Sequence, residues 1–379
     1  MQILADENIP YVREFFSTLG DVRTITGRSL QPTDLTNIDV LVVRSVTSVN
    51  ANLLKNTPIK FVGTATIGYD HIDLNFLEKN HIGFSYAPGC NATAAAEYVI
   101  SSLMIMSERQ GFDLTNKIVG IIGCGNVGSR VWQKLQALGV TCLRHDPPLQ
   151  EKLGNQDFVD LNKVLTADII TLHVPLEKTG PYPTHLMVNQ AFLAQLHPET
   201  LFINTSRGAI VDETALLTKL NQCPKMTAIL DVWANEPVIN QILLQRSNLG
   251  TPHIAGYSFD GKIAGTALLY QAICHYFACI PTAHISLPPA PLTGLSFSRT
   301  IDDKTAIQTA VLAAYDVRRD DAALRLSMQT DYPAQQFDLL RKNYPIRREF
   351  HNITITLPKE KKRLANTMQQ LGFNISFSA

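Results

Sequence analysis

Three polar residues, Arg207, Glu236 and His253, each come shortly after an apolar run, and together they could act on a hydroxy acid. An imidazole has an unperturbed pKa of about 6.5, which suits His253 to accept a hydroxyl proton as a general base. A neighbouring carboxylate such as Glu236 would favour the imidazolium and fix the tautomer and orientation of the ring. The planar guanidinium of Arg207 matches a carboxylate, so it could hold the acid group of a substrate.

Each of these residues also has an ordinary structural explanation when taken singly. Arg207 could cap a helix, Glu236 could be a surface residue in the turn before Pro237, and His253 could be a hydrogen-bonded loop histidine. The catalytic interpretation is favoured because a segment typical of dinucleotide binding precedes all three. Nicotinamide chemistry needs a protein group that takes a proton and another that orients the substrate.

That segment spans residues 117–146, KIVGIIGCGNVGSRVWQKLQALGVTCLRHD. An apolar run that predicts a buried strand leads to Gly123, Gly125 and Gly128 in the spacing G-x-G-x-x-G, and a helix is predicted over 127–138. Gly123 allows the tight turn, Gly125 lets a pyrophosphate approach the helix N-terminus, and Gly128 permits close packing of helix and strand.

The acidic residue that completes this pattern is Asp146, at the end of a second strand predicted over residues 140–143. An acid at this place accepts hydrogen bonds from the adenosine ribose. Its negative charge would repel the additional phosphate of NADP, and the only nearby cations are Arg144 and His145. We therefore expect NAD as the cofactor.

Predicted strands and helices alternate along the chain, which favours parallel sheets with crossover helices. Ligands bind at the carboxyl ends of strands in such sheets, and Arg44, Ser45 and Thr66 follow predicted strands there. The spacing is equally compatible with a surface ion pair for Arg44 and ordinary turn hydrogen bonds for Ser45 and Thr66. Strands are predicted over residues 2–5, 40–43, 61–62, 167–172, 201–203 and 228–230, and helices over 11–19 and 94–106.

The bulk composition sets the class of protein. A chain of 379 residues with 45% apolar residues is long enough for two or three domains with real cores. The formal net charge is zero, which predicts no nucleic-acid or anionic-membrane partner. The N-terminus is acidic where a signal peptide is basic, and the cysteines show no metal-binding spacing, so we expect a cytoplasmic protein with reduced thiols and no bound metal. The cysteines are Cys90, Cys124, Cys142, Cys223, Cys274 and Cys279.

The stretches NTSRGAIVD, LDVWANEP and TPHIAG, which contain the three polar residues, resemble motifs of the D-2-hydroxyacid dehydrogenase family. The resemblance covers residues 1 to about 280. It implies that Arg207 binds the substrate carboxylate, that Glu236 pairs with the histidine, and that His253 is the acid–base residue.

The same resemblance implies the fold and the cofactor contacts. The expected class is α/β, with two doubly wound parallel-sheet (Rossmann-like) domains plus a small C-terminal α+β dimerisation domain. We expect the substrate domain at 1–94 with a return segment at 256–280, the NAD-binding domain at 95–255 and the C-terminal domain at 286–379. NAD contacts are expected at Gly123, Gly125, Asn126, Val127, Gly128, Asp146, Val174, Asp231 and Gly256.

Further stretches resemble one subgroup of the family, whose substrate is a phosphorylated four-carbon hydroxy acid. They are ILADEN, VRSVT, GTAT and APGCNA in the first domain and YDVRRDD and LRKNY in the tail. This resemblance implies substrate contacts at Ser45, Thr66 and Tyr257, and Arg44 lies beside them. Val174 departs from the family, because a residue with a hydroxyl often stands there, so a side-chain hydrogen bond to the cofactor is lost.

The tail follows a proline-containing linker, predicted over residues 281–298, and has no catalytic signature. The subgroup resemblance implies that it forms a homodimer. Its basic residues predict either an ion-paired, solvated face or a ligand for the substrate phosphate, for which Arg347 across the dimer is the candidate. Helices are predicted over 305–315 and 361–371 and strands over 353–357 and 373–377; the basic residues are Arg318, Arg319, Arg341, Lys342, Arg347 and Arg348.

The implied activity is NAD-dependent oxidation of the 2-hydroxyl of 4-phospho-D-erythronate, in pyridoxal phosphate biosynthesis. One alternative is another dehydrogenase of the family, acting on phosphoglycerate or hydroxypyruvate. A second alternative, of a different class, is an NAD-sensing corepressor like the C-terminal binding proteins, which keep the same Arg–Glu–His set. The tail and the substrate-end residues favour the first activity over both.

Overall fold

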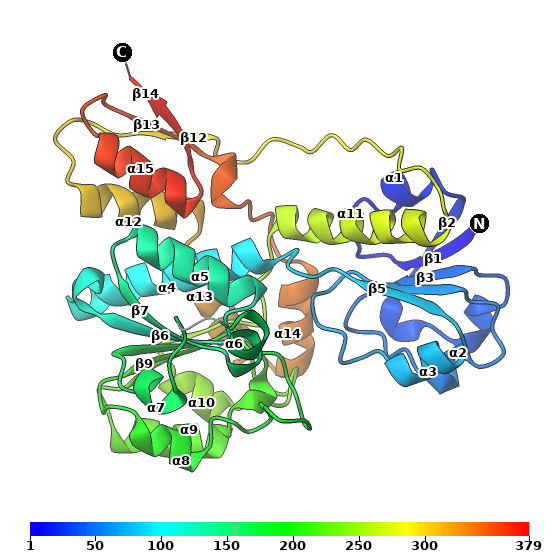
Figure 1. Cartoon of the computed structure of the whole chain (residues 1–379), viewed down its shortest axis with the longest axis horizontal. Helices are drawn as coiled ribbons and strands as arrows, with labels where there is room; N and C mark the ends of the chain where they lie inside the picture. The colour runs from blue at the N-terminus through cyan, green and yellow to red at the C-terminus, as the bar shows by residue number, and fades with distance from the viewer. Residues whose placement is uncertain (155–156, 379) are drawn as a thin grey trace. The chain divides into compact units, whose positions relative to one another are not determined.

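The computed structural model describes residues 1–154 and 157–378, which form two compact units (Figure 1). The first unit contains residues 1–91 and 258–289, and the second contains 92–257 and 290–379. No helix within the described residues is long and apolar enough to cross a bilayer. The separate third domain beginning at residue 286 stays a prediction, since the tail joins the NAD-binding region in the second unit.

The first unit is built on a parallel sheet, as the alternation of strands and helices predicted. The strand order over the described residues is β2-β1-β3-β4-β5. Helix α11 packs on β4 and β5 and against α1, where Tyr270 contacts Phe15 and Phe16. The elements are β1 (Gln2–Asp6), α1 (Val12–Phe16), β2 (Asp21–Ile25), β3 (Val40–Val43), α2 (Ala51–Leu54), β4 (Phe61–Thr64), α3 (Leu74–Lys79), β5 (Gly83–Tyr86) and α11 (Phe259–Tyr276).

The second unit is built on a larger parallel sheet, whose strand order over the described residues is β11-β10-β9-β8-β6-β7. Its central strands are buried apolar runs, as expected for a sheet covered on both faces. The elements are α4 (Ala92–Gln110), β6 (Ile118–Ile122), α5 (Asn126–Ala137), β7 (Thr141–His145), α6 (Pro147–Leu153), α7 (Leu161–Val164), β8 (Ile169–Leu172), α8 (Gln190–Gln195), β9 (Leu201–Asn204), α9 (Glu213–Gln222), β10 (Thr227–Leu230), α10 (Gln241–Arg246) and β11 (Leu249–Gly250).

Helix α4 is buried along most of its length, as its apolar sequence predicted. It packs against α5 of the NAD-binding region and against α12 of the tail. The hydroxyls of Tyr98 and Thr251 lie 2.8 Å apart, and Ser101 donates a hydrogen bond to the carbonyl of Tyr315. The tail and the NAD-binding region therefore share one hydrophobic core.

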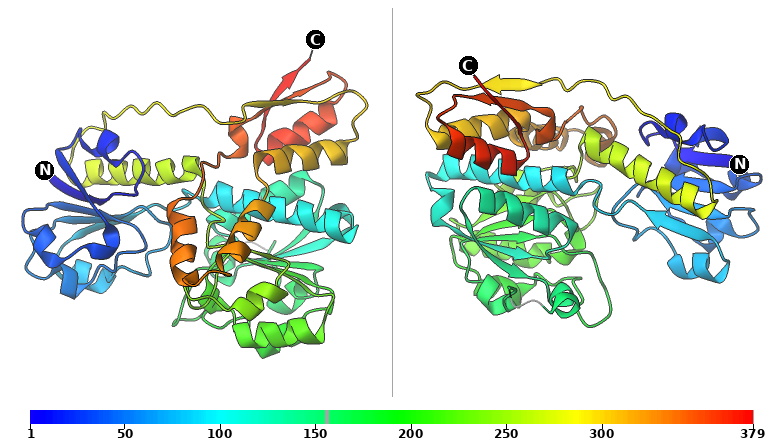
Figure 2. Two further views of the ribbon diagram at one scale, coloured as in Figure 1. Left: turned by 180° about the vertical axis from the view of Figure 1, so that it is seen from behind. Right: turned by 45° about the horizontal axis from the view of Figure 1, so that its top comes forward.

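The tail carries a small parallel sheet, with the order β12-β13-β14 in its described residues, together with helices that cover the NAD-binding region (Figure 2). Strand β12 lies inside the predicted linker, so that part of the prediction was wrong. A strand of three residues after several prolines has no clear periodicity, and it forms because it pairs with β13. The elements are β12 (Gly294–Ser296), α12 (Asp303–Ala314), α13 (Arg318–Ser327), α14 (Pro333–Lys342), β13 (Thr354–Leu357), α15 (Lys362–Leu371) and β14 (Asn374–Phe377).

Candidate active site

The candidate site lies in the second unit, at the carboxyl ends of neighbouring strands. Arg207 follows β9, Glu236 follows β10 and His253 follows β11, and these three strands are adjacent in the sheet. Loops at this edge are where doubly wound sheets bind ligands. The topology thus brings together residues that are far apart in sequence.

His253 and Glu236 form the pair expected from the sequence. The Nδ1 atom of His253 lies 2.8 Å from Oε2 of Glu236, and Oε1 of Glu236 accepts a hydrogen bond from the backbone N–H of Trp233. Burial opposes ionisation of Glu236, but the charge and hydrogen bond of His253 and the Trp233 N–H outweigh it, so the pKa of Glu236 lies below its ordinary value. The His253 side chain is 31% exposed, so it is accessible to a substrate.

Asp231 braces the loop that carries His253. Its carboxylate accepts hydrogen bonds from the backbone N–H groups of Ile254 and Ala255 and from the Thr251 hydroxyl, at 2.6–2.9 Å. The backbone N–H of His253 donates to the Asp231 carbonyl, and His253 adopts a φ of 57°, which is uncommon for a residue with a side chain. Burial raises the pKa of Asp231 in spite of these hydrogen bonds. The contact between Asp231 and NAD stays a prediction.

Arg207 lies just before the 3₁₀ turn Gly208–Ile210 and is half-buried. One guanidinium nitrogen donates to the Ser206 carbonyl at 2.9 Å. The next residue, Gly208, packs directly against the backbone of Trp233, and a Cβ atom at Gly208 would lie 1.9 Å from the Trp233 carbonyl carbon. This close approach ties the loop of Arg207 to the loop that leads to Glu236.

The glycine fingerprint has the geometry that a dinucleotide requires. Gly123 has a φ of 86°, and a Cβ at Gly128 would lie 1.9 Å from the carbonyl oxygen of Gly123, so both positions need glycine. A Cβ at Gly125 would meet no atom within 4 Å, which leaves open space at the N-terminus of α5. The residues thus fit a pyrophosphate on the first turn of α5, where Asn126 and Val127 lie.

Asp146 stands at the end of β7 and ties two loops together. Its carboxylate accepts hydrogen bonds from the backbone N–H groups of Cys124, in the glycine loop, and Leu149, in the first turn of α6. The neighbouring cations have other partners: the Arg144 guanidinium stacks 4.0 Å from the Trp132 ring centroid, and a ring nitrogen of His145 lies 2.8 Å from the Val159 carbonyl. This arrangement supports NAD over NADP.

His173 is a functional candidate that the sequence reasoning did not single out. It follows β8, lies beside Gly123, and its ring nitrogens contact the hydroxyls of Thr171 and Thr205 at 3.0 and 3.2 Å. Burial lowers the pKa of His173 to about 3, so the ring is neutral. Its place at the end of a central strand was the signal that could have found it. Of the remaining cofactor candidates, Val174 also borders Gly123, and Gly256 is half-buried after the His253 loop.

The candidates in the first unit lie at the ends of adjacent strands. Ser45 is exposed after β3, and Thr66 follows β4, where its hydroxyl contacts the Thr64 hydroxyl and the Gly68 carbonyl. Arg44 forms an ion pair of 3.0 Å with the buried carboxylate of Asp6. The ion pair considered from the sequence is therefore present, and the substrate contacts of all three residues stay predictions.

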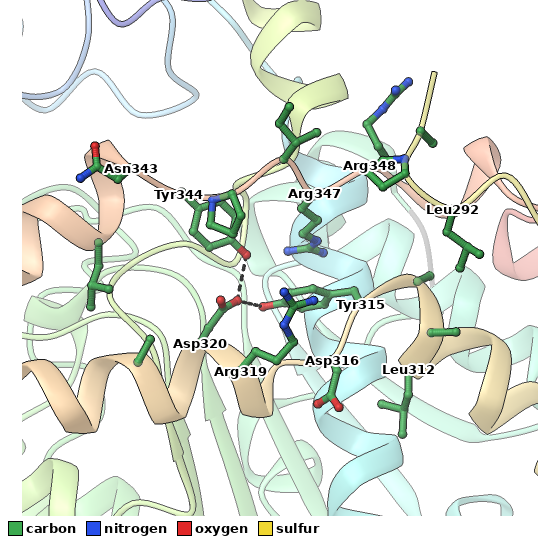
Figure 3. A pocket seen from close by; sticks show the side chains of 18 of the residues that line it. Leu292, Leu312, Tyr315, Asp316, Arg319, Asp320, Asn343, Tyr344, Arg347 and Arg348 are labelled. Carbon is green, nitrogen blue, oxygen red and sulfur yellow. Dashed lines mark hydrogen bonds between the residues drawn. The ribbon is translucent and has the colours of Figure 1, made fainter. Parts of the chain in front are cut away.

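Arg347 lies in the core of the second unit, beside a cavity of about 540 Å³ (Figure 3). Only 6% of the residue is exposed, its guanidinium stacks 3.6 Å from the Tyr315 ring centroid, and its terminal nitrogens donate to the carbonyls of Ala94 and Ala255. In the same cavity the hydroxyls of Tyr315 and Tyr344 donate to one oxygen of Asp320. These contacts give Arg347 a structural role within its own subunit, and its phosphate contact across the dimer stays a prediction.

Comparison with known proteins agrees with this geometry. Residues 92–255 match the profile of the D-isomer specific 2-hydroxyacid dehydrogenase NAD binding domain, and residues 286–372 match a domain of unknown function (DUF3410). Erythronate-4-phosphate dehydrogenase of Hahella chejuensis is 46% identical over 99% of this chain and 100% of its own length. The chain belongs to the erythronate-4-phosphate dehydrogenase family. Relatives with that name from Marinobacter nauticus and Escherichia coli are 45% and 46% identical over 99% of the chain.

Solved structures of the wider D-2-hydroxyacid dehydrogenase family share the fold. An NAD-bound 3-phosphoglycerate dehydrogenase of Entamoeba histolytica matches 73% of this chain and 95% of its own, with a TM-score of 0.64 and 25% identity. A D-lactate dehydrogenase of Aquifex aeolicus, complexed with NAD and lactic acid, matches 73% of this chain and 96% of its own, with a TM-score of 0.60 and 22% identity. The family prediction is confirmed, and the protein is an NAD-dependent dehydrogenase.

Proposed function

We propose that this chain oxidises the 2-hydroxyl of 4-phospho-D-erythronate to 2-oxo-3-hydroxy-4-phosphobutanoate, with NAD as the oxidant, as a step of pyridoxal phosphate biosynthesis. Full-length identity of 46% to a protein named for this substrate supports the proposal. The observation that carries it is the hydrogen bond between His253 and Glu236 at the edge of a sheet that also carries the glycine fingerprint.

The chemistry of the side chains follows from that hydrogen bond. Because Nδ1 of His253 faces Glu236, Nε2 is left to accept the proton of the substrate 2-hydroxyl. The imidazolium that results is stabilised by the negative charge of Glu236. Arg207 holds the substrate carboxylate and so orients the carbon that is oxidised. Bound NAD supplies the acceptor for the hydride that leaves this carbon.

The test is NADH formation with 4-phosphoerythronate, compared with 3-phosphoglycerate and unphosphorylated erythronate. Single-turnover conditions prevent slow release of NADH from hiding the activity. Selective turnover of 4-phosphoerythronate is the expected result. Preference for another hydroxy acid would contradict the substrate but keep the family chemistry, and binding of NAD without any turnover would favour the corepressor alternative.

Two further properties belong to the same proposal. The tail would form a homodimer, and the enzyme would act in the cytoplasm, where reduced cysteines are stable. Light scattering of the full chain at several concentrations measures the first property directly.

A further inference from the structure

Arg341 is a basic residue of the tail that lies beside the candidate active site. It stands in the last turn of α14, and its guanidinium carbon lies 5.8 Å from the centroid of the Tyr257 ring. Tyr257 comes four residues after His253 and packs edge-on against Tyr344 at 5.6 Å. All four residues belong to the second unit, so one compact body holds them together.

The electrostatics place Arg341 in the field of the catalytic pair. Burial disfavours its charge, but the electrostatic interaction and side-chain hydrogen bond with Tyr257 and the carboxylates of Glu236 and Asp338 outweigh it and raise the pKa of Arg341. Burial raises the pKa of Glu236. The charge of Arg341 is one of the causes that lower it in spite of burial. Arg341 is thus a permanent positive charge whose field reaches Glu236.

The guanidinium also has unused hydrogen-bonding capacity. Its Nε atom is buried and has no hydrogen-bond partner among the described residues. A buried donor without a partner is unfavourable, and an arriving acceptor removes that penalty. A phosphate is such an acceptor, because its oxygens match the planar fork of a guanidinium.

Other arginines of the tail are committed elsewhere. Arg347 is stacked on Tyr315 and bonded to backbone carbonyls, Arg318 forms an ion pair with Asp316, and Arg348 donates to Asn352. The Nε atom of Arg347 is also buried without a hydrogen-bond partner among the described residues, but this guanidinium is stacked in the core on Tyr315 and reaches the His253 loop only through the Ala255 carbonyl.

We propose that Arg341 binds the phosphate of the substrate, with Tyr257 holding the guanidinium in position. This inference rests on the proposed function, in which the substrate has a carboxylate for Arg207 and a phosphate that needs a second cation. It also assigns a role to the domain of unknown function at 286–372, which contains α14 and lies outside the NAD-binding profile. The tail would thus determine specificity within the same subunit as His253.

The test compares Arg341→Gln and Arg341→Lys with Lys342→Gln, a matched control at the next, exposed position of α14. Arg341→Gln should lower kcat/KM for 4-phosphoerythronate about 10- to 100-fold, mainly through KM, and leave that for erythronate nearly unchanged. Arg341→Lys should lower kcat/KM for 4-phosphoerythronate by less than Arg341→Gln does, and Lys342→Gln should keep the wild-type kcat/KM. Competitive inhibition by inorganic phosphate should weaken most in Arg341→Gln and keep its wild-type strength in Lys342→Gln.

Two results would overturn the inference. One is an equal loss of kcat/KM on the phosphorylated and unphosphorylated acids, and the other is unchanged inhibition by phosphate. Equal thermal unfolding midpoints of the three variants establish that each is folded. A wild type that fails to oxidise 4-phosphoerythronate rejects the proposed function, whereas an active wild type with a native KM in Arg341→Gln rejects only the phosphate role.

Discussion

The Nδ1 atom of His253 lies 2.8 Å from Oε2 of Glu236, although the two residues follow different strands. The second oxygen of Glu236 is held by the backbone N–H of Trp233, so the carboxylate cannot rotate freely. This arrangement orients the ring of His253 and leaves its other nitrogen for the substrate.

The first prediction concerns this pair. Glu236→Gln should lower kcat about 100-fold, because the amide lacks the charge that stabilises the imidazolium. His253→Ala and Arg207→Ala should each lower kcat/KM by orders of magnitude. NADH formation measures all three, and near-native activity in any of them would remove that residue from the catalytic set.

The second prediction concerns Asp231. Asp231→Asn should lower kcat at least 10-fold, because an amide can accept fewer of the three hydrogen bonds that shape the His253 loop. The dissociation constant for NADH, measured by fluorescence titration, should stay near the wild-type value if the brace is the main role. A large loss of NADH affinity with unchanged kcat would instead support the direct NAD contact expected from the family.

The third prediction uses two glycines of one loop as a matched pair. Gly128→Ala should unfold or strongly destabilise the second unit, because the new Cβ would lie 1.9 Å from the Gly123 oxygen. Gly125→Ala has room in the free protein, so it should fold normally and bind NAD about 10-fold or more weakly. Thermal unfolding and NADH titration separate the two effects, and normal NADH binding by Gly125→Ala would contradict the pyrophosphate site.

The fourth prediction concerns cofactor choice at Asp146. Asp146→Ser should lower activity with NAD and raise the NADP/NAD ratio of kcat/KM about 10-fold or more, because it removes the charge that repels a ribose phosphate. Activity with NADP should remain low, because Arg144 is held by Trp132 and a second aromatic ring, that of Phe158. An unchanged ratio would show that Asp146 does not select the cofactor.

The fifth prediction is a pH dependence of stability that arises where the tail meets the NAD-binding region. Glu97 is fully buried, accepts a hydrogen bond from the Phe350 backbone N–H and lies 3.8 Å from Lys134. Burial raises the pKa of Glu97 to about 7, in spite of Lys134, and burial likewise lowers the pKa of Lys134.

The sign follows from the raised pKa. Below the ordinary pKa of 4.5, Glu97 is protonated in both folded and unfolded states. As pH rises to about 7, the unfolded state loses this proton first, so the free energy of unfolding falls by roughly 3 kcal/mol. Glu97→Gln should remove this part of the dependence. Denaturant unfolding of both proteins from pH 4.5 to 8 measures it, and parallel curves would contradict the prediction.

The sequence by itself determined the features that depend on local geometry. The spacing of the glycines identified Gly123 and Gly128. Gly123 needs glycine because its φ is positive, and Gly128 needs glycine because a Cβ atom there would collide with the Gly123 carbonyl. Short apolar strands alternate with helices along the chain. This alternation determined that the sheets are parallel, because neighbouring parallel strands need a crossover connection, which a helix supplies. The order of Arg207, Glu236 and His253 after successive strands also sufficed to predict that they follow adjacent strands at one edge of the sheet.

Tertiary structure decided what depends on packing between distant segments. Strand β12 exists only because β13 pairs with it, some 60 residues later. The sequence indicated Asp231 only as an NAD contact, whereas the fold also places its carboxylate on the backbone N–H groups of the His253 loop, which it braces. Arg347 and Arg341 are equivalent as basic residues of the tail, yet packing buries the first on Tyr315 and directs the second to Tyr257. Charge and residue type are local properties, whereas the partner of each charge is set by the fold.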